Sequence, residues 1–175
     1  TSGLRRFAMK KLLAALLAMT LMLSLAACGG NGDGSGGGDA AQAPDLQAYF
    51  DDLMAGYGEN APSMMDVSQD TATLESIFPG LEDYELKQSV FQMAMISAVA
   101  YEIDLVECAN ESDVEAVKGI FQSRIDSQIE SGAFYPATVE AWQNAELIVN
   151  GNVVALIVAG EDQAQVVEAF NDLFA

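Results

Sequence analysis

The sequence predicts an α+β domain in which a four-stranded antiparallel sheet is built from two β-β-α units, with extra N-terminal helices packing on it. Two observations support this prediction. Over residues 84–107, and again over residues 145–159, apolar side chains recur with the period of two that is typical of strands. Each of these strand pairs precedes a segment with apolar residues at helical spacing, 112–130 and 161–174. We expect a single extracytoplasmic domain over residues 45–175.

Residues 1–27 have the layout of a secretory signal peptide. Basic residues at positions 5, 6, 10 and 11 precede an apolar run that begins at Leu12 and is too short to span a bilayer comfortably. The signal is complete when read from Met9, so we expect residues 1–8 to lie upstream of the natural start. The apolar run ends in Leu25-Ala26-Ala27-Cys28, and a glycine-rich stretch follows it.

The motif Leu25-Ala26-Ala27-Cys28 closely resembles the lipobox of bacterial lipoproteins. The resemblance implies cleavage before Cys28, attachment of a diacylglycerol to its thiol, and further acylation by a fatty acid such as palmitate. It also implies anchoring to the extracytoplasmic face of the cell membrane. A conventional signal peptide ending in Ala-x-Ala is the alternative. In either case residues 28–44 are expected to form a flexible tether, lipidated if the lipobox is used.

Charge and composition exclude several classes of function. Three basic and 26 acidic residues follow Cys28, which gives that part of the chain a net charge of −23. Nucleic acid is therefore not expected as a partner, because binding to phosphates requires clustered Lys and Arg. The chain has no histidine, so Ser-His-Asp and Cys-His nucleophiles are excluded, as is the commonest zinc ligand. We predict no catalytic residue, metal site or cofactor. We expect Cys108 to be buried rather than to act as a reactive thiol.

The first element of the domain is predicted to be an amphipathic helix capped by Asp45. Apolar residues recur on one of its faces at positions 46, 49, 50, 53, 54 and 57. A second, short helix is expected over residues 71–78, because Pro79-Gly80 would end it. Gly58 and residues 59–66 are expected to end the first helix.

The strands are predicted from side chains that alternate between the two faces of the sheet. Phe91 and Met93 are expected on one face of the first strand, and Val90 and Ala94 on the other. In the next strand, residues 101, 103 and 105 are apolar and alternate with acids. The dipeptide Asn150-Gly151 suits the two central positions of a type I′ turn, which predicts a hairpin of residues 145–149 and 152–159.

The last strand is apolar on both sides, so each face of the sheet must be covered. We expect the helices over residues 112–130 and 162–174 to follow matching hairpins and pack on the same face. The N-terminal helix is then the available cover for the opposite face. A binding surface is expected in a rim or groove beside that helix.

Several segments of the predicted domain also resemble a known family. The stretches MAMISA at 93–98, EIDLVEC at 102–108 and NGNVVALIV at 150–158 are similar to the Gram-positive bacterial lipoproteins called domain of unknown function 4358. This resemblance covers residues 74–175 and implies a membrane-anchored extracytoplasmic domain. It supplies no activity and no site residues.

We therefore expect a lipid-anchored module that binds an envelope protein or a small ligand. The alternative is an envelope hydrolase using paired carboxylates, for which Asp51-Asp52, Glu82-Asp83 and Glu161-Asp162 are the candidates. A third interpretation, an acidic coat that buffers cations, has only the net charge in its favour. Convergence of two carboxylates in a concave, partly apolar pocket would favour the hydrolase.

Overall fold

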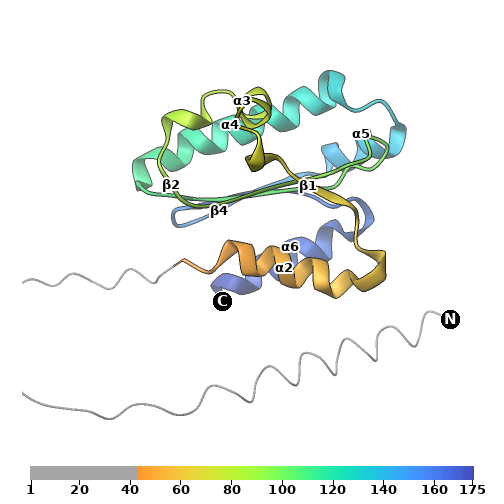
Figure 1. Ribbon diagram of the computed structural model, residues 1–175, viewed down its shortest axis with the longest axis horizontal. Helices are drawn as coiled ribbons and strands as arrows, with labels where there is room; N and C mark the ends of the chain where they lie inside the picture. Colours follow the sequence, from red (N-terminus) through yellow and green to blue (C-terminus); the bar gives the residue numbers. More distant parts are fainter. Residues whose placement is uncertain (1–42) are drawn as a thin grey trace, which may run out of the picture. The chain divides into compact units, whose positions relative to one another are not determined.

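The computed structural model describes residues 43–175. A five-stranded antiparallel sheet in the order β1-β2-β3-β5-β4 forms its centre, with helices on both faces (Figure 1). The strands are β1 (Met64–Asp66), β2 (Leu86–Ala94), β3 (Glu102–Cys108), β4 (Glu146–Asn150) and β5 (Val153–Val158). The helices are α2 (Leu46–Tyr57), α3 (Thr71–Ile77), α4 (Val114–Ser127), α5 (Pro136–Gln143) and α6 (Gln163–Asn171).

The prediction of four strands is wrong, because the sheet has a fifth strand, β1, at its edge. β1 pairs with the end of β2, where Met64 lies opposite Ala94 and Asp66 opposite Gln92. The sequence predicts no strand in this segment. Three residues are too few to show an alternating pattern, and only the exposed edge of β2 specifies the pairing. The rest of the α+β prediction, including the two β-β-α units β2-β3-α4 and β4-β5-α6, is confirmed.

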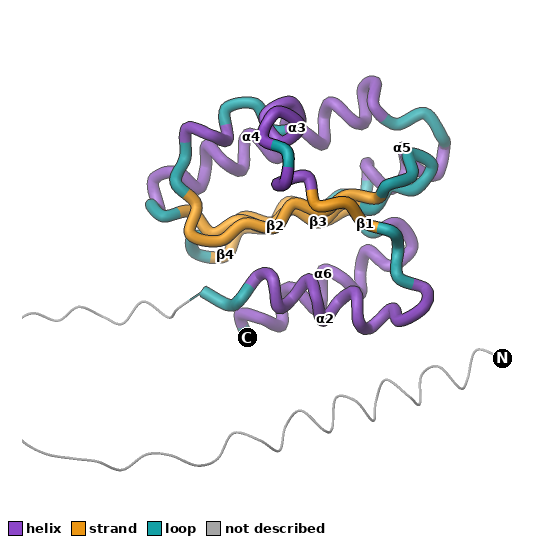
Figure 2. Tube along the Cα trace, in the orientation of Figure 1, coloured by secondary structure: helices purple, strands orange, loops and turns teal. Residues whose placement is uncertain are grey.

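Each face of the sheet has its own core. Beneath α3, α4 and α5 lie the side chains of Phe91, Val106 and Leu156, and this side is called face 1. Beneath α2 and α6 lie those of Ile103, Leu105 and Ile157, and this side is called face 2. Figure 2 shows the sheet between these two helical layers. The alternation predicted for β2 and β5 is confirmed.

The N-terminal helix docks as predicted. Asp45 caps it, because an oxygen of its carboxylate accepts a hydrogen bond of 2.9 Å from the Ala48 amide. Leu46, Tyr49 and Phe50 are buried against face 2. Each contributes about 1.5 to 3 kcal/mol at most, before ordering entropy is subtracted. This burial fixes the position at which the chain joins the domain.

The prediction that α4 and α6 share a face is wrong, because α4 lies on face 1 and α6 on face 2. The size of a single helix gives the reason. A 12-residue helix such as α2 is about 18 Å long and about 10 Å wide, whereas strands are spaced about 4.8 Å apart. α2 alone therefore cannot cover the apolar face of the central strands, and α6 covers the remainder.

The hairpin of β4 and β5 is present, but its turn is displaced by one residue from the prediction. Asn150 pairs with Val153, so Gly151 and Asn152 occupy the two central positions. Gly151 has φ of 56°, a left-handed conformation that glycine adopts without steric cost. Cys108, at the end of β3, is fully buried as predicted.

Candidate binding groove

One end of the sheet carries an open groove of about 1200 Å³. We call this end the proximal end, because the described chain begins there, next to the start of α2 (Figure 1). The turn of the β4–β5 hairpin and the residues that follow α6 also contribute to the walls. The lining residues on which the argument depends are Pro44, Lys87, Gln88, Glu107, Asn152 and Phe174.

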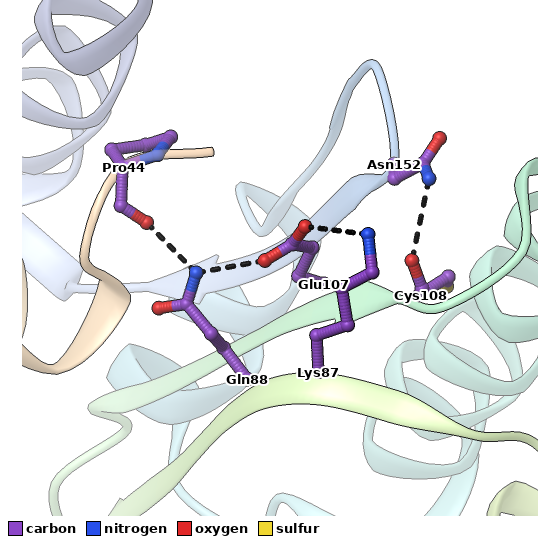
Figure 3. Close-up of polar contacts among 6 residues, drawn as sticks. All are labelled: Pro44, Lys87, Gln88, Glu107, Cys108 and Asn152. Atoms are coloured by element: carbon purple, nitrogen blue, oxygen red, sulfur yellow. Dashed lines mark hydrogen bonds and ion pairs between the residues drawn. The ribbon is translucent and has the colours of Figure 1, made fainter. Parts of the chain in front are cut away.

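A connected set of polar contacts forms one wall of the groove (Figure 3). The Gln88 amide nitrogen donates to the Pro44 carbonyl (3.1 Å) and to Glu107 Oε2 (2.8 Å). The amide oxygen of Gln88 accepts from the Leu46 backbone N–H at 3.0 Å, which satisfies a free donor at the start of α2. Gln88 therefore ties the first turn of α2 to the sheet.

A β-bulge brings the lysine into this wall. Consecutive residues of a regular strand point to opposite faces, yet both Lys87 and Gln88 reach Glu107. The register of β2 shifts between Leu86 and Gln88, and the extra residue turns the Lys87 side chain toward Glu107. Its Nζ lies 3.4 Å from Glu107 Oε1, and the Lys87 side chain is 54 % exposed. The ammonium group is thus available to a bound molecule.

Apolar side chains form the other part of the wall. Val153 is buried at its base, and Leu173 and Phe174 are half-buried beside it. The Phe174 ring packs against that of Phe170, with ring centroids 5.3 Å apart. Asn152 is held by a 3.3 Å bond from its amide nitrogen to the Cys108 carbonyl, which leaves its amide oxygen free to accept. The groove can therefore bind a ligand that combines polar groups with an apolar portion.

A second polar cluster is buried on face 1, toward the opposite, distal end of the sheet. Arg124 Nε donates to Glu102 Oε1 at 2.9 Å, and Nη2 donates to Oε2 at 2.8 Å. This is the bidentate geometry that makes an arginine–carboxylate pair strong. The guanidinium carbon also lies 5.2 Å from the centre of the Trp142 ring, within the range of a cation–π contact.

Asp104 lies two residues further along β3, on the same face as Glu102. Its carboxyl group is fully buried, and neither oxygen has a hydrogen-bond partner. Burial raises the pKa of Asp104 well above its usual range, and the neighbouring charge of Glu102 raises it further, whereas Arg124 acts in the opposite direction. The surroundings of Asp104 accordingly favour its protonated form.

The acids of β3 are buried, although they alternate with apolar residues. Their alternation with apolar residues is typical of a strand with one solvated face, but every residue of β3 is buried. β3 is central in the sheet and has helices on both sides, so the acids at 102, 104 and 107 lie inside. The sequence has only three bases after Cys28. The structure pairs two of them, Lys87 and Arg124, with acids of β3.

The acid pairs proposed for a hydrolase do not converge. Asp51-Asp52 lies on α2, Glu82-Asp83 in a turn before β2, and Glu161-Asp162 in a turn before α6, and all six side chains are exposed. Glu102 and Asp104 do lie side by side, but they are buried beneath α4. A cavity of about 420 Å³ between α3 and α4 reaches Arg124 and neither of these carboxylates. This arrangement does not support the hydrolase.

Leu25, Ala26, Ala27 and Cys28 lie outside the described residues, so the predicted lipid attachment stays a prediction. Within residues 43–175, no helix has the length and apolar character needed to cross a bilayer. The same residues contain no group of three or more acidic or cysteine side chains placed to hold a metal ion.

Comparison with known proteins identifies a family. No curated protein and no solved structure matches the chain. A family model described as Domain of unknown function (DUF4358) matches residues 58–159, which include all five strands together with α3, α4 and α5. α2 and α6, the two helices on face 2, lie outside the matched segment. Because the match spans more than half of the 175 residues, the chain belongs to this family of domains of unknown function.

Proposed function

We propose that the protein is a lipoprotein of the Gram-positive type, anchored through Cys28 to the extracytoplasmic face of the cell membrane, and that it serves as a binding module of the cell envelope. The lipobox-like motif and the preceding signal layout support the anchor. The groove at the proximal end supports the binding role, since it is the largest concave surface described above and joins fixed polar groups to an apolar wall.

The location of the groove fits a membrane-proximal ligand. Residues 28–42 precede Ala43 in the chain, so a lipid on Cys28 attaches the domain from its proximal end. Because only residues 29–42 separate the proposed lipid from the domain, the groove would stay close to the outer face of the cell membrane, while the negative charge of the domain keeps its body away from anionic headgroups.

The chemistry of the walls defines the ligand class. An exposed ammonium on Lys87, a free amide oxygen on Asn152 and the half-buried apolar side chains of Leu173 and Phe174 favour a small amphiphile or a peptide with one polar and one apolar end. Binding requires no catalytic group. The observation that supports the proposal most is this combination at the end of the domain to which the anchor is joined.

The test is to identify what the protein retains. The full chain is purified from membranes of its own host in mild detergent, and bound small molecules and peptides are measured by mass spectrometry. We expect a retained species that is lost from a Lys87→Ala/Phe174→Ser double variant. Lys118→Ala is the matched control, because Lys118 is a partly exposed lysine on α4, away from the groove. If the double variant retains the same species in the same amount, the groove is not the binding site.

A further inference from the structure

The distal end of the sheet, opposite the groove, carries a cluster of exposed apolar side chains. Three come from the β2–β3 loop and three from the segment that joins α4 to α5. Phe134 is 85 % exposed, which is unusual for a large aromatic side chain. We define the distal tip as Met95, Ile96, Val99, Ile129, Phe134 and Tyr135.

Contacts among the distal elements show that the two segments belong to one end of the molecule. The turn at Gly160–Asp162 contacts α5, and α5 contacts the last turn after α4. The Ala100 carbonyl lies 4.0 Å from the position of a Cβ on Gly160, which places the β2–β3 loop beside the same turn. Figures 1 and 2 show this loop and α5 at one end of the sheet, away from the start of α2.

The charges around the distal tip have one sign. Glu130 follows Ile129 directly, Asp126 precedes it by one helical turn, and Glu140 lies on α5; all three are exposed. Arg124 is the base of this region, and it is already paired with Glu102 beneath α4. Lys87 lies in the proximal groove, and Lys118 lies toward the start of α4. A partner of the tip therefore meets apolar side chains bordered by carboxylates.

We propose that the distal tip is a docking surface for a protein segment that carries both apolar and basic side chains. Apolar area gives the affinity, and charge complementarity selects the partner and its orientation. The tip is separate from the proximal groove by the length of β2, whose nine residues span about 30 Å. An anchor at the proximal end leaves this surface facing away from the membrane.

Two other occupants fit the surface less well. A bilayer with anionic headgroups repels the bordering carboxylates, and the chain joins the domain at the other end. A second copy of the chain would place the same acidic borders against each other, which costs binding energy. Both occupants are included as outcomes of the test.

The test uses residues 43–175, because every buried residue of both cores lies between Leu46 and Phe170. Fluorescence anisotropy measures binding of a synthetic amphipathic peptide made of Lys and Leu. A peptide of the same length and pattern made of Glu and Leu is the charge control. The variants are Phe134→Ser and Met95→Ser/Ile96→Ser, all at exposed positions. Val149→Ser is the matched control, an exposed apolar residue on β4 near the hairpin turn at the proximal end.

We expect the Lys/Leu peptide to bind and the Glu/Leu peptide not to bind. Each distal variant should weaken binding by about tenfold, the size expected for an aromatic or apolar anchor, with an unchanged melting temperature. Val149→Ser should bind as the unaltered domain does. Equal binding of both peptides, or a distal variant that binds like Val149→Ser, overturns the proposal. Binding to anionic phospholipid vesicles that the distal variants abolish, or a dimer in sedimentation equilibrium that they dissociate, also overturns it, in favour of a membrane or a second copy.

Discussion

Strand β3 supplies an acid to each end of the sheet, and the two ion pairs that result differ in almost every respect. Glu102 and Arg124 meet at 2.8 Å in a bidentate pair on face 1, with 4 % and 15 % of their side chains exposed. Glu107 and Lys87 meet at 3.4 Å toward the groove, and the lysine is 54 % exposed. The first pair is part of the core, whereas the second has one exposed partner, the lysine.

This difference indicates how the domain divides its tasks. A buried charge costs free energy unless it is paired, so the distal acids make Arg124 a structural requirement beneath α4. Only the lysine of the second pair is exposed, so the pair is expected to contribute less to stability than the buried one, and Lys87 is accessible for the binding role proposed above. The four predictions below test this division, in order of decreasing expected effect.

Arg124→Ala should have the largest effect. It leaves Glu102 buried without a partner, next to Asp104, and should lower the free energy of unfolding by about 3 to 5 kcal/mol. Urea denaturation followed by far-UV circular dichroism measures this loss. Lys118→Ala, which removes a partly exposed base from the same helix, should change stability by about 0.5 kcal/mol or less. Similar values for the two variants would contradict a structural role for Arg124.

Asp104 should make stability depend on pH. In the folded chain its raised pKa keeps the proton that the unfolded chain releases above pH of about 4. Its stabilising contribution is therefore complete below that pH and declines by up to about 1.4 kcal/mol per pH unit until the folded pKa is reached. Asp104→Asn should reduce this decline with pH. The variant should be more stable than the unaltered chain at alkaline pH.

The measurement is the free energy of unfolding from about pH 5 to about pH 8. Working above pH 5 separates Asp104 from Asp66 and Asp70, whose lowered pKa values place their effect at more acidic pH. Asp83→Asn, at an exposed position, is the matched control. An Asp104→Asn variant with the same pH dependence as the control would show that Asp104 is ionised in the fold.

Gly151→Val should lower stability by about 1 kcal/mol or more, because a β-branched residue tolerates a φ of 56° poorly. The hairpin turn borders the groove, so the variant should also weaken retention of the groove ligand. Thermal unfolding gives the first effect. Asn150→Val tests the position of the turn, since Asn150 lies in β4 and should accept the substitution. A larger loss for Asn150→Val than for Gly151→Val would place the turn one residue earlier.

Lys87→Ala should have the smallest effect on stability, between about 0 and 1 kcal/mol, because its partner Glu107 keeps the hydrogen bond from Gln88. Chemical denaturation measures this change. The same variant should still reduce ligand retention by the groove. A destabilisation as large as that of Arg124→Ala would mean that the two ends of β3 do not differ in the way described above.

Much of this fold is readable from local patterns. The apolar stripe of α2, the Asp45 cap and the two-sided apolar character of β5 predict a docked helix and a sheet covered on both faces. β1 was missed because its pairing depends on the edge of β2 rather than on its own three residues. The face occupied by α6 depends on how much of the sheet α2 leaves uncovered. The sequence of α6 alone therefore does not predict that face.

The candidate groove was predictable in position only. A surface beside the N-terminal helix was expected, and the groove does lie at the start of that helix. Its chemistry depends on the bulge at Lys87 and on contacts between residues about 20 to 44 positions apart, such as Glu107 with Lys87 and Gln88 with Pro44. The burial of Asp104 was not foreseen either, because an acid within an alternating strand is typical of a solvated face.

The proposed anchoring of this module through Cys28 is tested most directly by the intact mass of the protein from the membrane fraction of its host. We predict a mature chain that starts at Cys28 and carries the added mass of a diacylglycerol, with or without a further acyl chain. Two or more acyl chains give stable anchoring where one is marginal. Cys28→Ala should lose both the lipid and the membrane association. A mature chain that starts elsewhere without lipid, or a Cys28→Ala variant that remains in the membrane fraction, would contradict the account.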